Sequence, residues 1–269
     1  MRCVVFPKNF RELSPPELVR LVSELGFDGV DLIVREGYWL HRGNLEQALP
    51  QFVRLLREAG LKAETASTDY LDPNEPGTEE GLALLAEHGV RQYRIRHIPY
   101  RGAGTYWEDL GRSRRFLEGL EKLGEKYRLQ ALVQTHGGTI HPSASATYRL
   151  VQGFDPRWVA VHYDPGNLVC QEGLEDWNLG LDVLGDYLAL VGVKNAEAFY
   201  CPEENRWVFR WTALERGIVP WDRVLRLLDE RGYRGLYVFH PFYELELAEL
   251  IAQTQEDLRY FRRLLGEGA

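Results

Sequence analysis

Short apolar segments alternate regularly with amphipathic segments along the whole chain, and this alternation limits the fold more than any other feature. Eight segments have the length and apolar content of buried strands: 2–6, 29–34, 61–67, 90–98, 129–136, 158–164, 187–194 and 235–240. Each is followed by apolar residues at helical spacing, in 14–26, 44–60, 78–89, 107–127, 143–153, 175–186, 221–232 and 244–268. Strands separated by helices pair in parallel through right-handed crossovers, and eight such units close into a barrel. We therefore predict an α/β fold, a single-domain (β/α)8 TIM barrel over residues 1–269.

Local signals agree with this organisation. The first predicted helix has Ser14 as its N-cap, Pro15 at its first position and Gly26 as its stop. An open doubly wound sheet is the competing fold, but no GxGxxG follows the first predicted strand. No linker or low-complexity tract divides the chain.

The composition excludes several classes of partner. The formal net charge is −8, which gives no electrostatic footprint for nucleic acid or an anionic membrane. Cys3, Cys170 and Cys201 are scattered without Cys-x-x-Cys spacing, so they favour free thiols in a reducing compartment over disulfides or a thiolate zinc site. The chain has no signal-peptide h-region and no apolar run long enough for a membrane span. We predict a cytoplasmic protein with neither nucleic acid nor membrane as partner.

Polar residues gather where the predicted strands end, which is where TIM barrels hold their reactive groups. They are Asp31, Arg35, Glu64, Ser67, Arg96, His97, Gln134, His136, His162, Asp164, Lys194, Asn195 and His240. Any one of the histidines could be a satisfied interior polar group. The whole set indicates a site, because burying so many polar groups without a function is costly.

Several motifs resemble one family when they are taken in order. LVSELGFDGVDLI (21–33) resembles a second-strand entry, LVQTHGGT (132–139) a fifth-strand segment and AVHYDPGN (160–167) a sixth-strand Asp-x-Gly-His/Asn segment. LVGVKNA (190–196) is similar to a seventh-strand His-x-Lys-Asp/Asn segment, and residues 213–240 are similar to a Trp-containing helix followed by the last strand. Together they resemble the xylose isomerase-like TIM barrels, which include sugar-phosphate isomerases and epimerases and endonuclease IV.

The resemblance implies a metal site that this sequence has altered. The family's isomerases and epimerases hold one divalent cation with Glu, Asp, His and Glu, and the two glutamates move a proton through a cis-enediol. By position these ligands fall on Gln134, Asp164, Gly192 and His240, so only Asp164 is retained. Gln134 cannot abstract a carbon-bound proton as a carboxylate can, and Gly192 offers no side chain.

Two kinds of site remain open. In the first, Asp164 and His240 hold one divalent cation such as Zn, Mn, Mg or Co together with His136 or His162, and Gln134 is a further candidate ligand. In the second, the pocket is metal-free and His136, His162, Asp164, Lys194 and His240 form it. In both, the catalytic candidates are His240, Lys194, His136 and His162. Lys194 could also be a barrel-interior lysine that simply pairs with Asp164.

Two loops are candidates for contact with substrate. Residues 195–217 are too many for a plain connection and carry several aromatic residues with Arg206 and Arg210. Residues 97–107 form a second loop, rich in glycine and aromatic residues. Aromatic faces with polar donors suit a sugar, although the same aromatics could cover the barrel rim or a homodimer interface. The candidate substrate-binding residues are Arg96, Arg101, Trp107, Asn167, Asn195, Arg210 and Trp211.

The leading functional hypothesis is an isomerase, epimerase or dehydratase for a small carbohydrate, polyol or sugar phosphate. The alternative is a non-catalytic protein that binds a small sugar-like molecule in a degenerate site. A minor alternative is a DNA-repair enzyme like endonuclease IV, but that chemistry needs several zinc ions, and both the missing ligands and the negative charge disfavour it.

Overall fold

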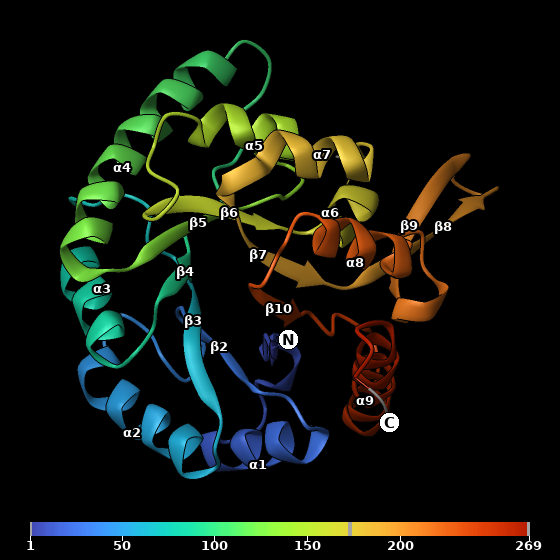
Figure 1. Cartoon of the computed structure of the whole chain (residues 1–269), viewed down its shortest axis with the longest axis horizontal. Helices are drawn as coiled ribbons and strands as arrows, with labels where there is room; N and C mark the ends of the chain where they lie inside the picture. Colours follow the sequence, from blue (N-terminus) through green and yellow to red (C-terminus); the bar gives the residue numbers. More distant parts are fainter. Residues whose placement is uncertain (1, 172–173, 268–269) are drawn as a thin grey trace.

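Eight parallel strands close into a barrel in the computed structural model, which describes residues 2–171 and 174–267 (Figure 1). Around the barrel the strands follow the order β1, β10, β7, β6, β5, β4, β3, β2. Their bounds are β1 (Arg2–Val5), β2 (Gly29–Val34), β3 (Lys62–Thr68), β4 (Gln92–Arg94), β5 (Gln130–Gln134), β6 (Val159–Tyr163), β7 (Leu188–Val193) and β10 (Leu236–Phe239). The predicted (β/α)8 barrel is confirmed.

Helices surround the barrel, as Figure 1 shows. They are α1 (Pro15–Leu25), α2 (Leu45–Glu58), α3 (Thr78–Glu87), α4 (Tyr106–Tyr127), α5 (Ala144–Val151), α6 (Pro165–Cys170), α7 (Trp177–Leu184), α8 (Trp221–Glu230) and α9 (Leu247–Leu264). The predicted start of α1 is confirmed: Ser14 and Glu17 form a capping box, and Gly26 ends the helix with a positive φ of 87°. Among the described residues, no helix combines the length and apolar character needed to cross a membrane.

Alternation along the strands divides the core into two layers. One layer lies between the strands and the helices, and the other fills the barrel and includes Val4, Ile33, Leu132, Ala160 and Leu190. Since side chains repeat every two residues on one face of a strand, the residues that follow in this inner series also point inward. The series turns from apolar to polar toward the carboxyl ends of the strands: Ala160, His162 and Asp164; Leu190, Gly192 and Lys194; Leu236, Val238 and His240. The barrel thus has an apolar floor and a polar mouth.

Three local features differ from the sequence prediction. The strand predicted over 90–98 is wrong in extent, because β4 ends at Arg94. A short helix, α6, begins directly after β6, with Asp164 as its N-cap and Pro165 at its first position. The long connection 195–217 contains an antiparallel hairpin of β8 (Asn195–Cys201) and β9 (Arg206–Thr212), which projects from the barrel in Figure 1.

Candidate functional site

A cavity of about 190 Å³ lies at the carboxyl end of the barrel strands. It is lined by Phe6, Lys8, Arg35, Arg94, His97, Gln134, His136, Asn167, Gln171, Lys194, His240 and Phe242. This lining combines four Lys and Arg side chains, three imidazoles and two aromatic rings, and it includes no carboxylate. The cavity therefore occupies the place where TIM barrels carry their active sites, and its wall is cationic.

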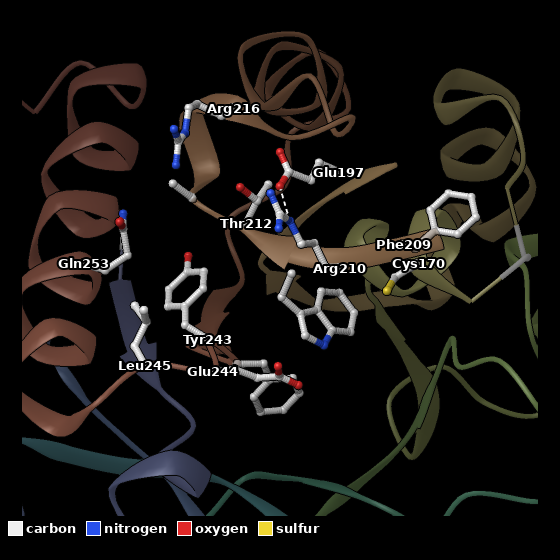
Figure 2. Close-up of a pocket in the computed structure, with 13 residues that line it drawn as sticks. Cys170, Glu197, Phe209, Arg210, Thr212, Arg216, Tyr243, Glu244, Leu245 and Gln253 are labelled. Carbon is white, nitrogen blue, oxygen red and sulfur yellow. Dashed lines mark hydrogen bonds and ion pairs between the residues drawn. The ribbon is translucent and has the colours of Figure 1, made fainter. Parts of the chain in front are cut away.

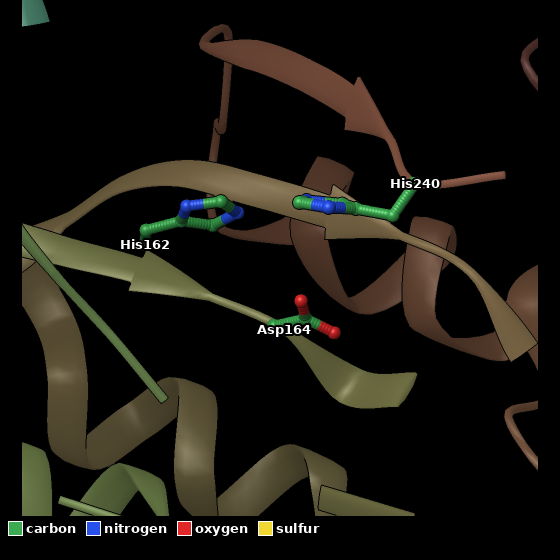
Figure 3. A group of neighbouring side chains, drawn as sticks. All are labelled: His162, Asp164 and His240. Atoms are coloured by element: carbon green, nitrogen blue, oxygen red, sulfur yellow. The ribbon is translucent and has the colours of Figure 1, made fainter. Parts of the chain in front are cut away.

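His162, Asp164 and His240 form a buried cluster at the base of this mouth (Figure 3). Each offers one ligand atom, and the three atoms lie within 4.8 Å of one another. Nε2 of His162 and both ring nitrogens of His240 have no hydrogen-bond partner among the described residues. Burial lowers the pKa of His162 to about 3 and holds the pKa of His240 well below its ordinary value. Both rings are therefore neutral at pH 7 and keep free lone pairs.

Gly192 makes room for this cluster. A Cβ atom at this position would lie 2.8 Å from Oδ2 of Asp164 and 2.9 Å from Nε2 of His162. Both distances are shorter than ordinary van der Waals contact. The space that a side chain at this position of β7 would take is therefore already filled by His162 of β6 and by Asp164, the N-cap of α6.

Asp164 and Lys194 form a buried ion pair, with Nζ 3.1 Å from Oδ2. The same oxygen accepts a 2.7 Å hydrogen bond from Nε2 of Gln134, and Oδ1 accepts one of 3.0 Å from the backbone N–H of Asn167. Burial lowers the pKa of Lys194, and the negative charge of Asp164 acts against this shift. The sequence left open whether Lys194 pairs with Asp164, and the structure contains this pair.

Aromatic rings enclose the ammonium group of Lys194. Nζ lies 4.6 Å from the centre of the Trp211 ring and 4.8 Å from that of Phe242. A Cβ atom at Gly166 would come within 2.5 Å of Cγ of Lys194, so only glycine lets the lysine take this course. The ammonium group is held at the wall of the cavity, which Lys194 lines.

By distance alone, His162, Asp164 and His240 could hold a metal ion, and two imidazoles with one carboxylate suit a first-row divalent cation. The charges do not suit it. Asp164 is the single carboxylate of the group, and its Oδ2 already carries the ammonium of Lys194 and an N–H of Gln134. A divalent ion at Asp164 would have to displace the ammonium group, in a cavity lined by three further cations. These residues therefore do not fit the family's divalent cation.

A series of hydrogen bonds connects Asp31 on β2 with Arg94 on β4, on the side of the barrel away from β6 and β7. Oγ of Ser67 donates to Oδ2 of buried Asp31 at 2.7 Å and accepts from Nε of Arg94 at 3.3 Å. Nη1 of Arg94 donates to the carbonyl of Ile95 and lies 3.1 Å from Nε2 of His97. Burial raises the pKa of Asp31 to about 7. These contacts hold the guanidinium of Arg94 in one orientation at the cavity.

His136 faces the cavity beside His97, and their ring centres are 4.0 Å apart. Nδ1 of His136 donates to the carbonyl of Gly137 at 2.7 Å, which leaves the Nε2 lone pair directed toward the amide of Gln171 at 3.4 Å. Burial lowers the pKa of His136, so this ring is also neutral. His141, by contrast, is fully engaged with the backbone of Gln134 and Ile98 and supports the strand end.

The predicted substrate-binding residues are only partly brought together. Asn167 lines the cavity, donates to the carbonyl of Thr135, and has an Oδ1 without a partner among the described residues. Asn195 is buried away from the cavity, and its amide bonds the backbone of Leu214, Val219 and Ala196. All its polar groups are used, so it holds the base of the hairpin and has none left for a ligand.

Three other candidates lie outside this cavity. Arg96 is exposed, because the chain leaves strand geometry after Arg94 and the two-residue alternation stops. Arg101 pairs with Glu108 and Asp109. Trp107 is 68% exposed at the start of α4, under the guanidinium of Arg149.

Arg210 and Trp211 lie on the hairpin, beside a second cavity of about 490 Å³ between the hairpin and α9 (Figure 2). Arg210 pairs with Glu197 across the two strands, as Figure 2 shows. Trp211 and Phe242 line this outer cavity, while both also contact Lys194. They therefore form the wall between the two cavities. The hairpin aromatics Phe199, Tyr200 and Trp207 remain exposed.

Five residues that line the cavity were not predicted from the sequence as site residues: Phe6, Lys8, Arg94, Gln171 and Phe242. Lys8 begins a short 3-10 helix (Lys8–Phe10) beyond the end of β1, so two-residue alternation does not predict its place at the cavity. Arg94 is the last residue of β4, and a strand prediction that ended there would have selected it over Arg96.

Comparisons with known proteins agree with the fold. A family model described as a xylose isomerase-like TIM barrel matches residues 19–264. No curated protein matches the chain.

Three solved structures illustrate the structural similarity. One is 3-keto-D-glucoside 4-epimerase YcjR from E. coli, with a TM-score of 0.74, 15% identity, and coverage of 98% of this chain and 99% of that one. Another is the probable 3-DHS dehydratase AsbF from Bacillus anthracis, with a TM-score of 0.72, 18% identity, and coverage of 96% and 98%. The third is a xylose isomerase-like TIM barrel protein from Mycobacterium smegmatis in complex with magnesium, with a TM-score of 0.72, 15% identity, and coverage of 98% and 96%.

Proposed function

The chain belongs to the xylose isomerase-like TIM barrel family, and we propose that it catalyses proton transfer on a small sugar-like substrate, as an isomerase, epimerase or dehydratase. One observation carries this proposal: His240 is buried at the cavity with both ring nitrogens unpartnered among the described residues, and Lys194 lines the same cavity. The sugar epimerases and the dehydratase among the structural neighbours support the general class of reaction.

The side chains at the mouth supply the groups that such a reaction needs. Removal of a proton beside a carbonyl requires a base and a positive group near the developing oxyanion. A neutral imidazole such as His240 can accept the proton, and the ammonium of Lys194 can donate a hydrogen bond to the oxygen. His136 follows β5, which lies three strands from β10 around the barrel, so it can act on the other side of a bound molecule.

In this proposal Lys194 replaces the divalent cation. The ammonium group lies against Asp164, the one retained ligand position, and it supplies the positive charge that a metal would otherwise provide. Zn, Mn, Mg or Co is therefore not required for activity. A reaction like that of endonuclease IV is not proposed, since the described residues bring together one group of three His and Asp side chains.

Proton exchange with solvent tests the function. The protein would be incubated in D₂O with keto- and aldo-sugars, sugar acids, sugar phosphates and inososes, each with and without EDTA, and followed by ¹H NMR. We expect loss of the proton beside the carbonyl, or a new product, for at least one compound, and the same rate with EDTA.

His240→Gln should abolish exchange, whereas His88→Gln, at the end of α3 and outside the cavity, should retain it. Compounds that raise the melting temperature without any exchange or turnover would contradict an enzyme and support the non-catalytic binding protein. The absence of both exchange and binding across the panel would also contradict the proposal.

A further inference from the structure

We infer that the substrate of this cavity is an anion, and that Arg94, Arg35 and Lys8 hold its carboxylate or phosphate group. The inference rests on the proposed function in one respect, since it names the class of molecule that the same cavity takes. It excludes neutral sugars as the preferred ligands.

The charges at the cavity are not balanced by acids. Four cationic side chains line it, and no carboxylate does. Lys194 is paired with Asp164, and Arg35 lies 3.4 Å from Asp69, whose side chain is 52% exposed. For Lys8 and Arg94 the part of the chain that the structure describes provides no ion pair. Two positive charges at the mouth therefore lack a counter-charge.

Arg94 is the central group, because a buried guanidinium without a carboxylate partner is costly. It is 4% exposed and donates to neutral acceptors, the hydroxyl of Ser67 and the carbonyl of Ile95. In the series of hydrogen bonds that includes Arg94, the acid is Asp31. Asp31 accepts its hydrogen bond from Ser67 and not from Arg94, and burial raises its pKa to about 7. Nε and Nη1 are engaged within the protein, so Nη2 of this fixed guanidinium is the nitrogen that can donate to an oxygen of a carboxylate or phosphate.

Arg35 adds one donor group that is free of both hydrogen bonds and ion pairs among the described residues, Nη2, while its Nε faces Oδ1 of Asp69 at 3.4 Å. Nε and Nη2 are buried and have no hydrogen-bond partner among the described residues. The guanidinium lies over the ring of Phe6, 5.7 Å from its centre, at the side of the cavity. Unpartnered buried donors of this kind are normally satisfied by a bound group.

Lys8 lies at the entrance of the cavity. It is exposed, and its Nζ lies 5.2 Å from the centre of the Phe242 ring, which lines both the inner and the outer cavity. A cation at the rim of a cationic cavity attracts an anion from solution. This attraction weakens as salt is added, because salt screens the charges.

The size of the cavity limits the ligand. A volume of about 190 Å³ lies below the roughly 300–1,000 Å³ that is common for ligand pockets. This accommodates a small polyhydroxy acid or sugar phosphate, or the reacting end of a larger one. The anionic group would lie on Arg94 and Arg35, and the carbonyl carbon would lie beside Lys194 and His240.

Calorimetric titration of the full chain with two matched sets of probes tests the inference. The first set is glycerol, D-glycerate and glycerol 3-phosphate, and the second is D-glucose, D-gluconate and D-glucose 6-phosphate, with inorganic phosphate alone as a further probe. In at least one set we expect an anion to bind at least about tenfold more tightly than the neutral compound. This preference should fall as salt is added.

Arg94→Met should remove most of the preference for an anion, and Lys8→Met should reduce it a few-fold. Lys122→Met, on the exposed surface of α4, makes the same change in net charge away from the cavity and should leave the affinity unchanged. If Arg94→Met does not fold, Lys8→Met at the exposed rim still decides the question.

Equal affinity for neutral and anionic members of both sets, or equal loss of affinity in Lys122→Met, would overturn the inference. Because binding is measured without turnover, the two proposals fail separately. Anion binding without proton exchange contradicts the proposed function alone, and exchange on a neutral sugar without a preference for anions contradicts this inference alone.

Discussion

The ammonium nitrogen of Lys194 lies 3.1 Å from Oδ2 of Asp164, and both side chains are almost completely buried. This pair occupies the position where the family resemblance places a metal ion. In the proposed function, a single positive charge held by one acid takes the place of a divalent charge held by several acids.

Removal of the lysine should destabilise the fold. In Lys194→Met the carboxylate of Asp164 stays buried without its cation, and breaking a buried pair in this way costs about 3–5 kcal/mol. Urea denaturation of Lys194→Met should show a loss of this order. The double variant Lys194→Met/Asp164→Asn should recover part of it, because no unpaired charge remains. A double variant no more stable than the single one would argue against a coupled pair.

Metal content should distinguish the two kinds of site directly. We expect purified protein incubated with Mn²⁺ or Zn²⁺ and then desalted to retain far less than one equivalent, as measured by elemental analysis. Lys194→Ala should bind more, since Oδ2 of Asp164 is then free to act with His162 and His240. One equivalent of metal in the native protein, lost in Asp164→Ala, would show that Lys194 does not replace the cation.

Gly192→Ala should disturb the cluster. The added methyl group would lie under 3 Å from both Asp164 and His162, so we expect a loss of about 1–3 kcal/mol in stability and reduced activity. Gly111→Ala is the matched control, because its added methyl group would lie 3.9 Å from Nη1 at the far end of the Arg115 side chain. In helix α4 this control should stabilise the protein by up to about 1 kcal/mol.

The stability of the protein should carry a pH dependence from Asp31. Burial raises the pKa of Asp31 to about 7, whereas in the unfolded chain the pKa of this group is near its ordinary value of 3.8. Between these values the folded protein holds a proton that the unfolded chain has released. The contribution of Asp31 to stability is therefore fully present below about pH 4 and is lost as the pH rises through about 7.

Asp31→Asn removes this titration. Relative to the native protein, the variant should gain stability as the pH rises from 4 to 7, by at most about 1.4 kcal/mol per pH unit. Urea midpoints measured at several pH values provide the check. A difference between the two proteins that is constant over this range would show that Asp31 ionises normally in the fold.

Much of the fold was predictable because the strands and helices have distinct periods. The apolar strand segments and the capped helices identify all eight units, and the inner series of β6, β7 and β10 places Asp164, Lys194 and His240 at one mouth. The approach of these side chains follows from the closure of the barrel.

The details at the strand ends were less predictable, because they depend on where strand geometry stops. Arg94 and Arg96 have the same chemistry, but only Arg94 remains in register with the barrel. Asn195 looks like a site residue in sequence and instead bonds the backbone of the hairpin. The partners of these groups come from distant segments, which local sequence patterns do not specify.

The absent side chain at Gly192 has a consequence for how such a site could change over time. A new ligand on β7 would collide with His162 and Asp164, so no single substitution there can return the mouth to a metal-binding form. A smaller residue would have to replace His162, and the ion pair between Lys194 and Asp164 would have to break. A ligand side chain at position 192 would therefore need a compensating replacement at His162 as well.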